Sequence, residues 1–255
     1  MQYSFDWLFG GTLMATVSNN RELPGKGFFA WSAIVMAGIV AFSFPLTYYL
    51  PIVSGTHRFQ TLHHLHALAF FGWMALYVWQ AQLVARGQVA RHREIGLVGF
   101  ALTGTLIPLG IWMAQRAAEI RLNAGASRPY EFTWYNFVDI TLFAVLMVAS
   151  MVLVTRRKDW HRRLTFVAAL CLVAPAATRW TFKFPLPPLP LDIFVYLVMD
   201  PFLVALALYD RKTLGRVHSA TLTCIAILLP LQVSSAWIAR SAWWNTIAPG
   251  LVGAP

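Results

Sequence analysis

The chain has 255 residues, of which 58% are hydrophobic and 12% are charged, and its formal net charge is +10. Charged residues make up about a quarter of an ordinary soluble domain, so this composition, with a mean hydropathy of +0.58, excludes a water-soluble globule. The long apolar runs also exclude a collagen and a disordered chain. The two cysteines, Cys171 and Cys224, lie within those runs and define no disulfide scaffold. We therefore expect an all-α integral membrane protein.

Seven apolar segments are long enough to be transmembrane helices, since a bilayer core of about 30 Å needs about 20 helical residues. They are expected at 28–50, 65–85, 94–115, 133–155, 164–180, 191–209 and 219–239. The chain then divides into a cytoplasmic N-terminal segment 1–27, a transmembrane domain 28–240 and an extracytoplasmic tail 241–255. Within the first segment, Tyr3–Val17 lacks the layout of a signal peptide and predicts an interfacial helix.

Basic residues in the connecting loops predict the orientation of the spans. Most of the 20 Lys and Arg fall on the side of the N-terminus, in the N-terminal segment and in the loops after the second, fourth and sixth spans. By the positive-inside rule, we expect a cytoplasmic N-terminus, an extracytoplasmic C-terminus and a location in the bacterial inner (cytoplasmic) membrane. Contact with the lipid bilayer accounts for the charge, so we expect no nucleic-acid partner.

Four of the seven histidines gather just before and at the start of the second span, at His57, His63, His64 and His66. Residues three apart share a helix face, so His63 and His66 can grip one metal ion if further ligands come from elsewhere. A polar helix cap is the alternative interpretation.

A second histidine set, His92, His161 and His218, opens the third, fifth and seventh spans, each time after a basic loop. If these spans surround a common centre, the three imidazoles can converge on zinc or another transition metal, or two of them can ligate a haem iron. Interfacial histidines among lipid headgroups are the alternative. The shared loop layout is also compatible with a threefold repeat of a helical hairpin after the first span.

Two carboxylates lie inside spans, Asp139 in the fourth and Asp200 near the middle of the sixth. An aspartate at the centre of a membrane helix costs roughly 2.5–3.5 kcal/mol and is usually paired, inward-facing and functional. We expect both residues to act in catalysis, as proton carriers or beside a metal. A hydrogen-bonded latch between helices is the alternative.

Two arginines lie at the outer ends of spans, at the depth of His63, His66 and Asp139. Arg116 ends the third span and Arg179 ends the fifth. Arginine pairs well with carboxylates and phosphates, so we expect these residues to hold a cofactor or an anionic ligand group. Pairing with Asp139 or Asp192 and a surface salt-bridge role are the alternatives. One composite outer site is compatible with this placement.

Short motifs at the helix starts resemble a set of bacterial polytopic membrane proteins that are mostly described as uncharacterised. The motifs are His66-Ala-Leu-Ala-Phe-Phe-Gly-Trp, His92-Arg-Glu-Ile-Gly and His161-Arg-Arg-Leu. The resemblance implies the fold class and no mechanism. Alkaline ceramidases and the adiponectin-receptor group open their last span with a His-x-x-x-His zinc pair. This chain has only His218 there, with Leu222 four residues later.

The leading functional hypothesis is a membrane redox protein in which histidines bind a b-type haem or a transition metal, with a quinone as a candidate partner. Three alternatives remain open. The first is a non-catalytic accessory subunit or assembly factor that partners other membrane subunits. The second is a proton-coupled small-molecule carrier that uses Asp200, and the third is a zinc-dependent membrane hydrolase. The sequence leaves open whether the protein is an enzyme.

Overall fold

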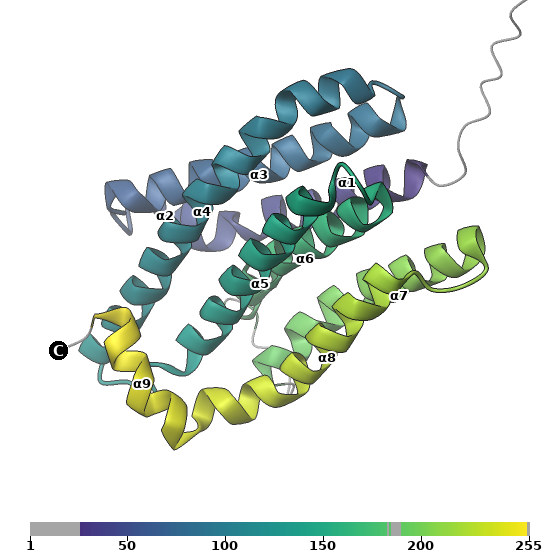
Figure 1. The fold of residues 1–255 in the computed structure, drawn as a ribbon. Coiled ribbons are helices and arrows are strands. Elements are labelled where there is room, and N and C mark those ends of the chain that lie inside the picture. Colours follow the sequence, from purple (N-terminus) through teal and green to yellow (C-terminus); the bar gives the residue numbers. More distant parts are fainter. Residues whose placement is uncertain (1–25, 183, 185–189, 254–255) are drawn as a thin grey trace, which may run out of the picture.

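The computed structural model describes residues 26–182, 184 and 190–253, and this part of the chain is all-helical (Figure 1). The helices in chain order are α1 (Lys26–Ser43), the short π-helix η1 (Pro45–Tyr49), α2 (Leu50–Val53), α3 (Thr61–Ala85), α4 (Val89–Asn123), α5 (Glu131–Leu153), α6 (Lys158–Thr181), α7 (Leu191–Leu214), α8 (Ser219–Arg240) and α9 (Ala242–Val252). The interfacial helix predicted for Tyr3–Val17 lies outside the described residues.

The seven expected spans are confirmed as helices that are long and apolar enough to cross a membrane. Within the described residues they run over Gly27–Val53, Thr61–Ala85, Val89–Asn123, Glu131–Leu153, Lys158–Thr181, Asp192–Leu214 and Ser219–Arg240. Helix α4 has 35 residues, which at 1.5 Å per residue is about 52 Å and more than a bilayer core needs. The predicted span 94–115 covered only its apolar middle.

Helix α6 forms the centre of the bundle and contacts α1, α5, α7 and α8. Every side chain from Phe166 to Ala174 is buried, as expected for a helix that is apolar all round. Small side chains such as Ala168, Ala169 and Ala177 let the neighbouring helices approach closely. Large apolar side chains such as Val233 and Trp237 face outward instead, 85% and 77% exposed, where lipid would cover them.

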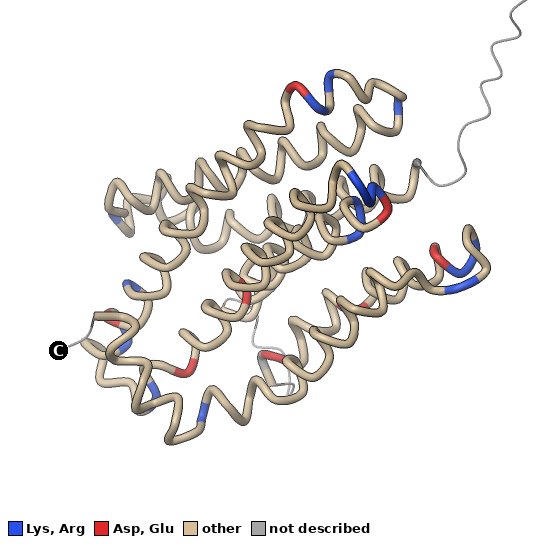
Figure 2. Tube along the Cα trace, in the orientation of Figure 1, with Lys and Arg blue, Asp and Glu red and all other residues tan. Residues whose placement is uncertain are grey.

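The connections α3–α4, α5–α6 and α7–α8 lie together at one end of the bundle, and Figure 2 shows their Lys and Arg residues gathered there. We call this the basic end. The paired helices run as antiparallel hairpins, so the basic loops share one side as the sequence predicted. The orientation in a membrane and the threefold repeat stay predictions.

The segment expected as a tail, 241–255, contains helix α9, which packs against the end of the bundle opposite the basic end. The Ser241 hydroxyl caps α9 by accepting a hydrogen bond from the Trp244 amide at 3.1 Å. The Trp244 indole is buried and donates to the Tyr130 carbonyl at 2.9 Å. These contacts attach the C-terminal segment to the start of α5.

Candidate functional site

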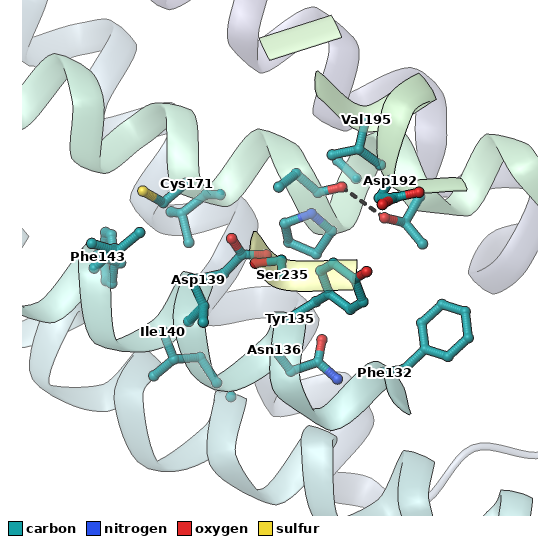
Figure 3. A pocket seen from close by; sticks show the side chains of 18 of the residues that line it. Phe132, Tyr135, Asn136, Asp139, Ile140, Phe143, Cys171, Asp192, Val195 and Ser235 are labelled. Carbon is teal, nitrogen blue, oxygen red and sulfur yellow. Dashed lines mark hydrogen bonds between the residues drawn. The ribbon is translucent and has the colours of Figure 1, made fainter. Parts of the chain in front are cut away.

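A cavity of about 530 Å³ lies between α3, α4, α5, α6, α7 and α8, in the half of the bundle away from the basic end. Most of its wall is apolar, with side chains such as Phe70, Leu106 and Phe143. Polar side chains enter it from several helices (Figure 3). An apolar pocket of 300–1,000 Å³ with a few convergent polar groups is the usual form of a small-molecule site.

Asp139 projects from α5 at this cavity (Figure 3). Residues four apart share a helix face, and Tyr135, one turn earlier, lines the cavity too. None of the hydrogen bonds or ion pairs among the described residues involves the Asp139 carboxyl group. A carboxyl group inside a span thus borders open space and has no partner in the part of the chain that the structure describes.

His66 on α3 and Arg179 on α6 line the same cavity. The Nδ1 atom of His66 is buried and has no hydrogen-bond partner among the described residues. Arg179 donates to the Thr47 hydroxyl at 2.8 Å, and its guanidinium lies 4.0 Å from the centre of the Phe44 ring. No described carboxylate pairs with Arg179, so it faces the cavity as an arginine held by neutral groups.

Charged groups also ring the cavity at the end of the bundle opposite the basic end. The Arg240 guanidinium donates to Glu131 at 2.7 Å, and that of Arg121 lies 3.5 Å from the centre of the Phe132 ring. Asp139 lies about two turns further along α5 than Glu131, or about 12 Å along the helix axis. The cavity therefore has a charged rim and one acid deep in an apolar interior.

Two of the predicted outer residues lie outside the cavity lining. The His63 ring packs edge-on against Trp112, with 4.8 Å between ring centres. Arg116 forms an ion pair with Glu119 one turn later on the same helix. The structure thus brings His66, Asp139 and Arg179 to one cavity and leaves His63 and Arg116 out of it.

Asp200, unlike Asp139, has a hydrogen-bond partner among the residues that the structure describes. The Gln232 amide on α8 donates to the Asp200 carboxyl group at 3.0 Å, and Asp200 does not line the cavity. This contact matches the latch that the sequence left open as an alternative. A catalytic role for Asp200 stays a prediction.

The three histidines at the basic end divide into a pair and a single residue. The rings of His92 and His161 lie 6.3 Å apart, whereas His218 lies 6.1 Å from the Trp160 ring. The Nδ1 atom of His218 accepts from the Ala220 amide at 3.1 Å and caps α8. Within the described residues, no group of three or more His, Cys, Asp or Glu side chains could hold a metal ion.

Neighbouring side chains occupy one nitrogen of each paired ring. Ser150 Oγ lies 2.7 Å from His161 Nδ1. Gln80, with its amide oriented to satisfy both ends, donates to His92 Nδ1. A haem or metal at this pair stays a prediction.

The structure also contains a buried polar network that the sequence analysis missed. Arg163 and Asp210 are both fully buried and form an ion pair, with Arg163 Nε donating to Asp210 at 2.9 Å. The Thr221 hydroxyl donates to Asp210 at 2.5 Å and the His218 amide at 3.1 Å. The network joins α6, α7 and α8. The sequence does show Asp210 at the end of one span and Arg163 at the start of another. Both were interpreted as charged loop residues, so the pair was not predicted.

The described part of the chain is thus all-helical and has seven candidate membrane spans around a central cavity. Comparison with protein-family models, with curated proteins and with solved structures finds no match for this chain.

Proposed function

We propose that the protein binds a small amphipathic molecule inside the helical bundle and that Asp139 anchors it. The observation that carries this proposal is a carboxyl group within a candidate span that faces a cavity and has no partner among the described residues. An acid at such a depth is costly unless something pairs with it. A bound ligand supplies that partner.

The wall of the cavity supports a particular ligand chemistry. Its apolar interior suits a hydrophobic body of up to about 530 Å³. A ligand group that donates a hydrogen bond or carries positive charge suits Asp139. His66 and Arg179 provide further polar contacts for an oxygen-bearing group.

This proposal is closest to the carrier hypothesis, with Asp139 in the role that the carrier hypothesis assigned to Asp200. A quinone is one candidate ligand of this kind, since it joins an apolar body to hydrogen-bonding oxygens. The accessory-subunit hypothesis is also compatible with a bound ligand, if that ligand stabilises the fold. The described residues contain no group of three side chains that could hold a metal ion, so they give the zinc-hydrolase hypothesis no support.

The test is mass spectrometry of small molecules extracted from the detergent-purified full chain. We expect wild-type protein to carry a stoichiometric compound. Asp139→Asn should weaken binding at least about tenfold, the effect of losing one charged hydrogen bond in an apolar site, and so lower the amount of ligand retained through purification. Ala117→Phe, which fills the cavity wall without changing charge, should also reduce it.

Glu94→Gln is the matched control, because Glu94 is an exposed acid on α4 away from the cavity. Its ligand content should equal that of the wild type. If the wild-type, Asp139→Asn and Ala117→Phe proteins all yield the same compounds, or none, the proposal is wrong.

A further inference from the structure

A second hollow, of about 510 Å³, lies at the basic end between the α5–α6 loop and the start of α8. Three consecutive cations line it, Arg156, Arg157 and Lys158, and all three are exposed. The hydroxyl groups of Thr155 and Ser219 line it as well. This hollow is separate from the cavity at Asp139 and plays no part in the proposed function.

The cations of the hollow have no acidic partners in the part of the chain that the structure describes. Asp159 is the acid that lines the hollow there, and Arg162 pairs with it at 2.6 Å while Arg163 approaches it at 3.7 Å. Asp159 is thus already neutralised by other residues. The hollow keeps an excess of positive charge from three side chains.

The start of α6 adds to this positive potential. Arg157 is the N-cap residue, and its side chain makes no capping hydrogen bond. The first backbone amides of a helix without a side-chain cap lack hydrogen-bond acceptors, and the helix dipole places partial positive charge at the same helix end. Since α6 has 24 residues and begins at Lys158, an anion in the hollow meets both the side chains and this helix end.

The hollow also lies at the depth of lipid headgroups. It sits between the end of one candidate span at Leu153 and the start of the next at Lys158. Trp160 lines it and is half-buried, and tryptophan favours the headgroup level of a bilayer. The phosphate of a membrane lipid is already held at this depth, whereas an anion dissolved in water is not.

We propose that this hollow binds the phosphate of one anionic phospholipid. Arg156, Arg157 and Lys158 supply the charge, and the two hydroxyl groups and the start of α6 supply hydrogen bonds. The proposal selects one basic loop out of three. General attraction between the basic end and an anionic surface would instead involve all three loops alike.

The experiment is native mass spectrometry of the full chain titrated with phosphatidylglycerol, with phosphatidylcholine as the neutral comparison. The triple variant Arg156→Gln/Arg157→Gln/Lys158→Gln should bind the first phosphatidylglycerol roughly 100-fold more weakly, about fivefold for each charge removed. The single variant Arg157→Gln, which disturbs the loop less, should show about a fivefold loss.

The matched control is Arg211→Gln/Lys212→Gln/Arg216→Gln, which removes the same charge from exposed residues in the last turn of α7 and the loop after it, at the same end of the bundle. It should bind the first phosphatidylglycerol as the wild type does. Equal losses in both triple variants would overturn the proposal in favour of diffuse attraction. Equal binding of phosphatidylcholine, or displacement of the lipid by millimolar inorganic phosphate, would overturn it as well.

Discussion

Asp139, Asp200 and Asp210 all lie within candidate spans, and they meet three different environments. Asp210 is held by Arg163 and Thr221, and Asp200 by Gln232. Asp139 borders a cavity with no described partner. Asp200 lies near the middle of α7, Asp210 lies near the basic end of the same helix, and Asp139 lies in the other half of the bundle on α5. Their neighbours differ as well, and they give a structural ion pair at Asp210, a latch between helices at Asp200 and a candidate ligand anchor at Asp139.

The buried pair predicts a strong effect of a single substitution. Arg163→Met leaves Asp210 as an uncompensated charge among buried groups, which should lower the free energy of unfolding by about 3–5 kcal/mol. Denaturant unfolding of the purified protein in detergent measures this loss. The double variant Arg163→Met/Asp210→Leu removes both charges and should recover much of it. A single variant as stable as the wild type would show that the pair contributes little.

The cap of α8 predicts a pH dependence. Burial and the nearby Arg163 guanidinium lower the pKa of His218 below its ordinary value of 6.5, against the opposite effect of Asp210 and Asp159. The folded state therefore prefers neutral His218, whose Nδ1 caps the helix. Its stabilising contribution is fully present above pH 6.5 and is lost as the pH falls through the lowered pKa.

Unfolding of wild type and His218→Asn between pH 7.5 and pH 5 measures this effect. Asparagine is a good N-cap that does not titrate, so the stability of the variant should fall less on acidification. Parallel pH profiles of the two proteins would show that the His218 cap does not titrate in this range.

At the scale of elements, α9 is held mainly by one aromatic side chain. Trp244 is 3% exposed, whereas its neighbour Trp243 is 59% exposed. Trp244→Ala should destabilise the protein by about 3–5 kcal/mol, the usual cost of emptying a large aromatic site. Trp243→Ala is the control and should change stability little. Thermal unfolding in detergent compares them, and equal melting temperatures would contradict this account of α9.

The spans themselves could be predicted from the sequence, because a membrane helix needs only sufficient length and apolar composition. Helix α9 could not, since it has 11 residues and owes its place to Trp244 and Tyr130. The extra length of α4 could not be predicted either, because its polar ends around Arg91 and Arg121 do not look like part of a span.

At the scale of the whole molecule, the sequence predicted how far along its span each residue lies. It did not predict in which direction around the helix axis the side chain points. His66, Asp139 and Arg179 were placed at similar depths, and the structure brings them to one cavity. The three histidines of the basic end were also placed at one depth, yet His218 turns away to cap α8. Rotation about a helix axis depends on packing between helices, which hydropathy does not encode.

The charge distribution predicts the orientation of the molecule in a membrane. In a background with Cys171 and Cys224 replaced by Ala, we expect Ser127→Cys to react with an impermeant maleimide in intact cells. Gln88→Cys, exposed at the basic end, should react only after the membrane is opened. The reverse pattern would show that the basic end faces outward.

The central claim is that a ligand occupies the cavity beside Asp139. An experimental density map of the wild-type protein in lipid nanodiscs tests it most directly, compared with a map of Asp139→Asn prepared in the same way. The account predicts elongated non-protein density in the wild-type cavity, within hydrogen-bond distance of the Asp139 carboxyl group, and its loss in the variant. A cavity that holds only water in the wild type, or identical density in both maps, would contradict it.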